Sequence, residues 1–452
     1  MFSSLLRKTS FLVLASVCLS RGAAAQDAVL QVGANILVGR GPEGRLLVEP
    51  HLAAHPTDPH HLLAVGWVTT ASALTAAREG RSVAHCATFL SSDSGRSWAR
   101  RDLTSAGCGD PWVALTAQGP AVLTALGRHA SLPDSSRQLL VFFSGDGGRT
   151  WHDVPQSLGR GHDAPRAAAA SDGTVYILSG QGWRDSAGRL RWSVFVGRAR
   201  PGRLYVEILP RIFPSNLNLN SDGLAVLSDG ALVITYNDYQ RNVRGFTPDS
   251  GVLKGRRTWA MLSTERGEAF SIPLLVTESC YTRPTFLAVD TSSGPYRDRL
   301  YHVCVGDRER GILLTYSADR AEQWSEATPI EALGSRDRSR QDPQVAVSGR
   351  GIVGIAWNDR RDDPSGRCYA PYFTASHDGG RTFAPGVRVA SALSCPDPAR
   401  NGDAFRRWPT GGDYFGLAAS ADGRFHLLWS DARNGVFELW TAAVTVRAAQ
   451  KE

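Results

Sequence analysis

The chain repeats one short pattern three times, and this repeat constrains the fold more than any other feature. The pattern is Ser-x-Asp-x-Gly-x-Ser/Thr-aromatic, found as SSDSGRSW at 91–98, SGDGGRTW at 144–151 and SHDGGRTF at 376–383. Such an Asp can accept hydrogen bonds from N–H groups of its own turn, and the Gly supplies a positive φ. We interpret the repeat as a structural turn formed by Asp93, Gly95, Trp98, Asp146, Gly148, Trp151, Asp378, Gly380 and Phe383.

A metal site is the alternative interpretation of the repeated Asp. Calcium loops place several acids at alternate positions, whereas each copy of the repeat carries one. The pattern therefore predicts no metal, and nothing in the sequence predicts a cofactor.

Short apolar segments separated by turn residues fill the rest of the chain and predict an all-β fold. Each unit has an apolar strand, a turn such as SDG or ADG, a second strand, a third strand ending near the repeat, and a short fourth strand. Four antiparallel strands per unit, repeated around a circle, indicate a β-propeller with the repeats between strands three and four. We count seven blades, with six as the alternative. The first strands begin near Glu49, Asp110, Ala164, Ser221, Arg283, Asp342 and Asp413.

The last unit, residues 413–446, has three strands and lacks the repeat. The segment AVLQVGANILVG at 28–39 precedes the first unit and has no other partner. We predict that it supplies the fourth strand of the last blade, because this closure removes an open sheet edge.

The N-terminus has the pattern of a secretory signal. Arg7 and Lys8 precede the apolar run 11–19, and an Ala-x-Ala site predicts cleavage after Ala25. We therefore expect a signal peptide over 1–25, a single propeller domain over 26–452, and a secreted or periplasmic monomer. No later stretch has the ~20 apolar residues of a transmembrane helix.

Charge argues against a nucleic-acid partner. The formal net charge is +7, and it falls to about +4 when the three basic residues of the signal are removed. The Arg residues are dispersed among acids and form no basic stripe.

Six cysteines remain after cleavage, and an even number in an exported chain predicts disulfides. We predict that neighbours in sequence pair, while free buried thiols are the alternative. The residues concerned are Cys86, Cys108, Cys280, Cys304, Cys368 and Cys395.

The three repeats resemble the Asp-box, or BNR, repeats of the sialidase superfamily, and the layout of the mature chain is similar to that of secreted bacterial sialidase-like proteins. The resemblance implies a propeller more strongly than it implies activity, since Asp boxes also occur in propellers that are not sialidases. Sialidase sites use three Arg to hold the substrate carboxylate, an Asp acid/base, and a Tyr nucleophile activated by a Glu.

Candidate site residues lie on the face opposite the repeats. An Asp, usually followed by an Arg, ends the second strand in YNDYQ, VGDRE, WNDRR and WSDAR. We expect these residues to bind a ligand or, alternatively, to form ion pairs between blades: Asp238, Asp359, Arg361, Asp431 and Arg433, with Arg283 beside them. By the resemblance, Arg283, Arg361 and Arg433 are the candidate ligands of the substrate carboxylate, Tyr414 is the candidate nucleophile, and Asp110 or Asp342 is the acid/base.

The sequence departs from the sialidase pattern at two points. The Phe/Tyr-Arg-Ile-Pro signature is absent, with YTRPTF at 281–286 as the nearest match, and no Glu is evidently placed to activate Tyr414. The leading hypothesis is a secreted propeller that binds a glycan, glycoconjugate or other anionic ligand at a charged channel mouth. The alternatives are an exo-alpha-sialidase-type hydrolase and a structural or assembly role with another exported protein.

Overall fold

The computed structural model describes residues 28–42, 44–72, 84–215, 218–239, 257–280, 285–306, 311–331 and 340–448. The signal peptide expected over 1–25 lies outside these ranges, as does Arg283. Within the described ranges, no helix is long and apolar enough to cross a membrane.

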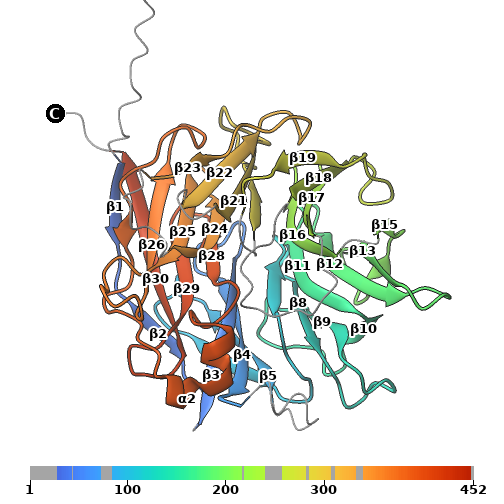
Figure 1. Ribbon diagram of the computed structural model, residues 1–452, viewed down its shortest axis with the longest axis horizontal. Helices are drawn as coiled ribbons and strands as arrows, with labels where there is room; N and C mark the ends of the chain where they lie inside the picture. The colour runs from blue at the N-terminus through green and yellow to red at the C-terminus, as the bar shows by residue number, and fades with distance from the viewer. Residues whose placement is uncertain are drawn as a thin grey trace, which may run out of the picture.

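Seven antiparallel sheets of four or five strands form a ring, which confirms the predicted seven-bladed β-propeller (Figure 1). The first three blades are built from β3 (Arg45–Ala54), β4 (Leu62–Thr70), β5 (His85–Ser91) and β6 (Ala99–Leu103); β7 (Trp112–Leu115), β8 (Ala121–Gly127), β9 (Gln138–Ser144) and β10 (Gln156–Arg160); and β11 (His162–Ala169), β12 (Val175–Arg184), β13 (Leu190–Ala199), β14 (Glu207–Ile208) and β15 (Ile212–Ser215).

The next three blades each contain four strands. They are β16 (Asn218–Val226), β17 (Leu232–Tyr239), β18 (Arg257–Ser263) and β19 (Leu274–Thr277); β20 (Phe286–Val289), β21 (Leu300–Val305), β22 (Ile312–Ser317) and β23 (Thr328–Pro329); and β24 (Gln341–Val347), β25 (Val353–Asp359), β26 (Ala370–Ser376) and β27 (Val387–Arg388).

The seventh blade joins both ends of the described chain. It contains β28 (Gly416–Ala419), β29 (Phe425–Asp431) and β30 (Glu438–Ala448), and β30 pairs antiparallel with β1 (Ala28–Val32) and β2 (Ile36–Gly39). Figure 1 shows the blue β1 beside the red β30. The predicted closure by the N-terminal segment is confirmed. One helix, α2 (Pro398–Arg407), lies in the link that enters this blade.

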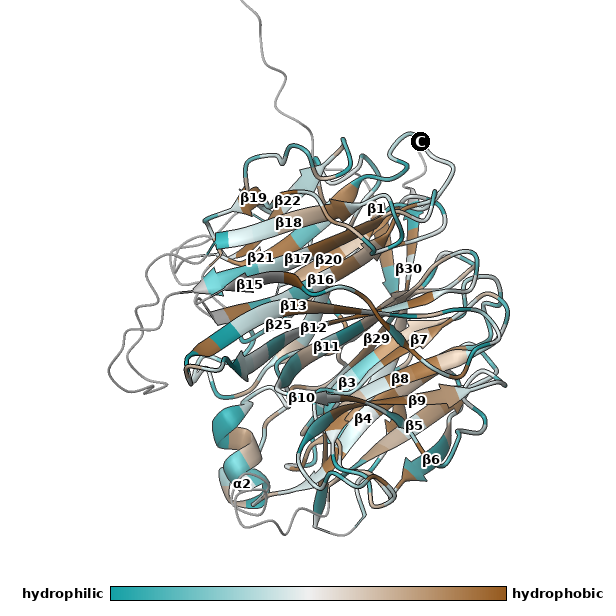
Figure 2. Cartoon of the chain, turned by 90° about the vertical axis from the view of Figure 1, so that its right-hand side faces the viewer, coloured by the Kyte–Doolittle hydropathy of each residue, from teal (hydrophilic) through white to brown (hydrophobic). Residues whose placement is uncertain are grey.

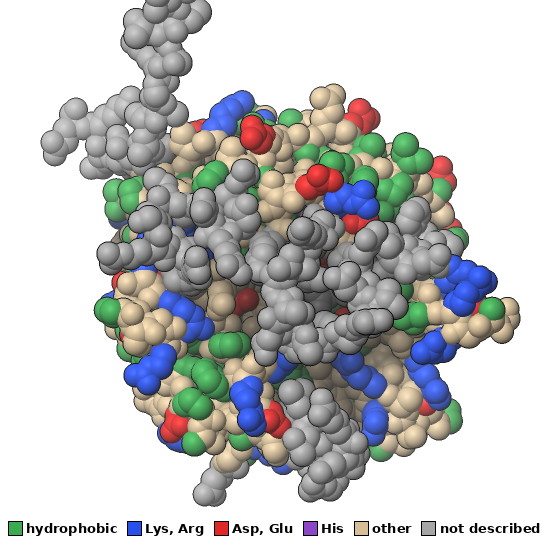
Figure 3. All heavy atoms as spheres, viewed as in Figure 1, with side chains coloured by type: hydrophobic (Ala, Val, Ile, Leu, Met, Phe, Trp, Pro, Cys, Tyr) green, Lys and Arg blue, Asp and Glu red, His purple; other side chains and the backbone are tan. Residues whose placement is uncertain are grey.

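Most of the second and third strands are buried on both sides, so the core lies between adjacent blades. Figure 2 shows hydrophobic segments along the strands and hydrophilic ones in the loops. Trp151, for example, packs with Leu63 and Val65 of the first blade. On the face drawn in Figure 3, positive and negative side chains are interspersed.

The repeated Asp side chains accept hydrogen bonds within their own turns. Asp146 accepts one from the Thr150 amide at 2.8 Å and one from the Thr150 hydroxyl at 2.7 Å. Asp93 and Asp378 do the same with the residues four positions on. Gly148 has φ 93°, and a Cβ there would lie 2.6 Å from Leu63 Cδ1, so a side chain fits neither the backbone nor the space.

All three disulfides pair neighbours in sequence, as predicted. Cys86 bonds to Cys108, Cys280 to Cys304 and Cys368 to Cys395. A bridge between nearby residues closes a short loop and restricts the unfolded chain by about 3 kcal/mol in the chain-entropy treatment.

Candidate functional site

The first strands of the seven blades surround the central axis. They begin on the face that also carries the loops between second and third strands and the links between blades; we call this the link face. The turns between third and fourth strands lie on the opposite face, which we call the turn face. Residues at the start of the first strands therefore meet around one end of the channel.

The same irregularity occurs in three of these first strands and directly before a fourth, β7. A residue with positive φ precedes a proline at Glu49 (φ 49°), Asp110 (46°), Ala164 (49°) and Asp342 (54°). Because proline cannot donate to the ladder, strand pairing shifts register across this point in β3, β11 and β24. Bulges of this kind redirect side chains, and here three of the four positions carry a carboxyl group.

Glu49 is buried between the first two blades. Its side chain is 1% exposed and its Oε2 accepts a hydrogen bond from the Asp110 amide at 3.0 Å. Burial, with the nearby charges of Asp110 and Asp413, raises the pKa of Glu49 well above its ordinary value. The carboxyl group is therefore stabilised in its neutral form.

Asp110 and Asp342 form the more accessible part of this acidic group. Burial raises the pKa of each to about 6, and the charge of Asp163 adds to the effect at Asp110. Arg137 lies 3.4 Å from Asp110 Oδ2. Asp342 Oδ2 accepts hydrogen bonds from the Thr410 hydroxyl at 2.7 Å and the Asn358 amide at 3.1 Å. Both acids change protonation state in a mildly acidic range.

Aromatic side chains fill the channel beside these acids. The Trp112 ring stacks on His51 with centroids 3.5 Å apart, and contacts Tyr414 edge-on at 5.5 Å. Arg166 lies over Trp112, with Cζ 4.3 Å from the ring centroid, and over Phe286 at 5.5 Å. Side chains from distant blades thus contact one another around the axis.

Arg166 is only partly satisfied in this position. It is 4% exposed, donates from Nη1 to the Pro165 carbonyl at 3.0 Å, and its Nε has no hydrogen-bond partner within the described ranges. Near the start of two other first strands lies a buried polar atom that has no hydrogen-bond partner among the described residues. These atoms are Thr285 Oγ1 and Gln344 Nε2.

Tyr414 lies beside the acidic residues, but its hydroxyl already donates a hydrogen bond to the backbone. The side chain is 3% exposed and donates to the Pro111 carbonyl at 3.0 Å. Burial, followed by the charges of Glu49 and Asp110, raises its pKa well above the ordinary 10. A nucleophilic phenol needs a base that accepts its proton, and no carboxylate among the described residues accepts a hydrogen bond from it.

The Asp and Arg residues at the ends of second strands form ion pairs within the fold. Arg361 Nη2 lies 2.6 Å from Asp359 Oδ2 and 2.9 Å from Glu331 of the preceding blade. The indole N–H of Trp357 donates to the same Asp359 oxygen at 2.8 Å. Asp238 is paired similarly with Arg257 at 3.0 Å.

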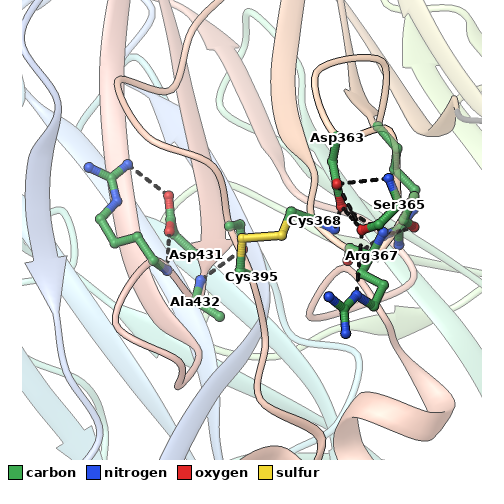
Figure 4. The surroundings of a disulfide bond; sticks show 11 residues. Asp363, Ser365, Arg367, Cys368, Cys395, Asp431 and Ala432 are labelled. Atoms are coloured by element: carbon green, nitrogen blue, oxygen red, sulfur yellow. Dashed lines mark hydrogen bonds and ion pairs between the residues drawn. A yellow bond between two sulfur atoms is a disulfide. The ribbon is translucent and has the colours of Figure 1, made fainter.

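The seventh blade repeats this arrangement. Arg433 Nη2 lies 2.8 Å from Asp431 Oδ2, and the Trp429 indole donates to that oxygen at 2.7 Å. Arg433 also donates to Asn35 and to Ser391, which follows the preceding blade. Figure 4 shows Asp431 with its guanidinium partner beside the Cys368–Cys395 disulfide. These contacts correspond to the ion-pair alternative for the motif.

The chain is similar to known proteins in its fold but not in its sequence. No family model matches the chain, and no curated protein matches it in sequence. A solved Dyadobacter fermentans protein of unknown function aligns over 92% of this chain and 99% of its own, with TM-score 0.52 and 10% identity.

The chain has a seven-bladed β-propeller fold. Solved structures similar to it include the Hadza microbial sialidase Hz136 (TM-score 0.48, 13% identity, 88% of this chain) and the phage phi92 endosialidase (0.49, 9%, 94%). The propeller covers 65% of the length of the former and 70% of the latter.

A pocket of about 260 Å³ lies on the other side of this propeller, at the turn face. It is enclosed where the seventh blade meets the first, by residues that include Gly33, Arg96, Arg424 and His426. His426 is occupied by a contact with the Ser420 hydroxyl at 3.0 Å.

The sequence interpretation missed the residues that fill the propeller channel. His51, Trp112, Arg166 and Gln344 each follow the proline of a first-strand bulge directly. The x-Pro pattern was visible in EPH, DPW, APR and DPQ, and the position after proline is the signal that would have identified the channel lining.

Proposed function

We propose that this propeller is an exported glycan-binding protein whose site is the acidic end of the channel on the link face. The observation that carries the proposal is the set of carboxyl groups at equivalent positive-φ positions before a proline, Glu49, Asp110 and Asp342, each with a raised pKa. A carboxyl group accepts hydrogen bonds from sugar hydroxyls when ionised and also donates one when protonated.

The charge of this site favours an uncharged sugar over a carboxylated one. Asp110, with 18% of its side chain exposed and its pKa raised to about 6, would repel an anionic ligand above that pH. The side chain of Asp413 is 41% exposed and adds a second acidic group. Arg361 and Arg433, which the sequence offered as carboxylate ligands, are already paired with Asp359 and Asp431. We therefore place neutral oligosaccharides before sialosides as ligands.

Binding to an array of neutral and sialylated glycans, followed by calorimetry on the best ligand, tests this proposal. Asp110→Asn and Asp342→Asn should each weaken binding of a neutral glycan about tenfold, since a charge-assisted hydrogen bond contributes ~1.5–3 kcal/mol. Asp146→Asn, on the turn face, is the matched control and should bind as the wild type does. Equal binding by all four proteins would refute the site.

A glycoside hydrolase is the second candidate, and the pKa values of about 6 at Asp110 and Asp342 favour it, because a general acid works best with a pKa near the operating pH. Release of fluorophore from neutral and sialylated glycosides, lost in Asp342→Asn, would support catalysis. If Tyr414→Phe alone abolished sialoside cleavage, the sialidase assignment of Tyr414 would hold. A protein that binds glycans but cleaves no glycoside supports the first proposal. A protein that neither binds glycans nor cleaves glycosides supports an assembly role.

The three disulfides fit a protein of an oxidising compartment. We propose that the signal is cleaved after Ala25 and that the mature chain is a monomer in the periplasm or outside the cell.

A further inference from the structure

Cys280, His302 and Cys304 form a compact buried cluster in the fifth blade, away from the acidic site. Their three potential ligand atoms lie within 4.8 Å of one another. His302 and Cys304 are two positions apart on β21 and therefore point to the same side of the sheet. Cys280 reaches them from the preceding link, where it forms an isolated bridge with Gly306.

The ring nitrogens of His302 make no hydrogen bond to the described residues that would explain a histidine at this position. The side chain is fully buried. Its neighbours include the edge of Trp324 and the two sulfur atoms. The buried His162 and His426, in contrast, contact the Ser179 hydroxyl at 2.6 Å and the Ser420 hydroxyl at 3.0 Å.

An unpaired buried polar group costs ~1–3 kcal/mol, so an imidazole retained there without a partner calls for an explanation. The sulfur atoms provide one. In the structure they are joined as a disulfide, which is a poor ligand, but two thiolates beside an imidazole are a set of soft metal ligands.

We propose that reduction of the Cys280–Cys304 disulfide creates a binding site for one Cu⁺ ion, with the two thiolates and the His302 imidazole as its ligands. A dithiol reductant supplies two electrons and two protons and becomes a disulfide itself. The metal then replaces the thiol protons, which pass to solvent.

The ligand set favours Cu⁺ over Zn²⁺. Structural zinc takes four ligands in a tetrahedron, and the described residues of the cluster offer three. Leu313 and Ala327 line the surroundings and provide no fourth donor. Thiolate ligands select soft ions, and a three-coordinate environment of two sulfurs and one nitrogen suits monovalent copper. The Cα atoms of the two cysteines are 5.6 Å apart, so thiolates can separate around an ion by side-chain rotation.

Titration of the full-length mature protein with Cu⁺ under anaerobic conditions, against a chromogenic chelator, tests the proposal. The reduced wild type should bind Cu⁺ tightly, and X-ray absorption at the copper edge should show two sulfur neighbours and one nitrogen. His302→Leu should weaken binding by more than about tenfold and remove the nitrogen signal. Cys280→Ser/Cys304→Ser should abolish this site, and the oxidised wild type should lack it.

The Cys86–Cys108 disulfide offers a matched control. It is also buried, and His85 is adjacent in sequence but is held by Asp102 at 3.1 Å. The variant Cys86→Ser/Cys108→Ser should retain the two-sulfur, one-nitrogen site. If His302→Leu does not fold, His302→Gln, checked by circular dichroism, replaces it. Unchanged copper affinity and nitrogen signal in the folded His302 variant would overturn the proposal, as would equal binding by oxidised wild type.

Discussion

Asp342 combines two opposing influences on one carboxyl group. Hydrogen bonds from Thr410 and Asn358 favour the ionised form, while burial favours the neutral form and has the larger effect, raising its pKa from 3.8 to about 6. The folded protein therefore binds this proton more tightly than the unfolded chain does. The contribution of Asp342 to the free energy of unfolding is highest below about pH 4 and is lost as the pH rises towards 6.

Asp342→Asn should remove this pH dependence. Both hydrogen bonds end on one oxygen, which the amide of Asn can also provide. We expect the variant to gain stability relative to the wild type between pH 4 and 7, by about 2–3 kcal/mol at most. Denaturant unfolding at successive pH values measures the difference. Parallel pH profiles for the two proteins would contradict the assignment.

Individual site residues were only partly accessible to sequence reasoning. Asp110 and Asp342 were placed correctly at the starts of first strands, because an acid before proline marks that position. Their raised pKa values depend on charges and burial contributed by other blades, which no local pattern encodes. In the sequence, Trp112 and Arg166 have the pattern of ordinary strand residues. Their contact arises only because the closed propeller brings the second and third blades together.

At the scale of the element, the Trp-x-Asp-x-Arg motif connects the end of a second strand to the link from the preceding blade. The Asp is fully buried and accepts from the indole two residues before it, while the Arg reaches outward to the neighbouring link. The motif thus fixes the spacing between blades at the link face.

Arg433→Ala should destabilise the protein by about 3 kcal/mol, because it leaves the buried Asp431 without its counter-ion. Asp431→Asn in the same chain should recover part of that loss, giving a measurable coupling in a double-mutant cycle. The control is Arg406→Ala, whose 77% exposed side chain pairs with Asp403 and should contribute less than ~1 kcal/mol. Lost glycan affinity with unchanged stability would instead assign Arg433 to the ligand.

The sequence predicted the strands, turns and disulfides better than it predicted individual site residues. Strand order, the position of the turns and neighbouring disulfides follow from short-range patterns. The ion-pair alternative for Asp359 and Arg361 could not be separated from ligand binding, since both require the same residues at the same face.

For the whole molecule, the decisive contact is the pairing of β1 with β30. Residues 28–32 pair with 444–448, and Leu30 and Val32 pack against the large core of blades five to seven. Without β1, residues 444–448 of β30 would present an unpaired edge, while β2 would still pair with 439–441.

Deleting residues 28–32 should lower the free energy of unfolding by about 3 kcal/mol or more, from lost hydrogen bonds and apolar burial. The exposed edge should also promote self-association. Thermal unfolding and light scattering after size-exclusion chromatography measure both effects, with the chain beginning at residue 26 as reference. A monomeric deletion variant of unchanged stability would show that β1 does not close the ring.

This closure also sets an order of events for folding. Of the described strands, β1 is synthesised first and its partner β30 last, about 400 residues later. Contacts that join distant parts of a chain slow folding, and unpaired strand edges expose intermediates to aggregation. Each inner blade can assemble from consecutive residues as it emerges, but the seventh cannot be completed before β30 has been synthesised, so the ring can close only then.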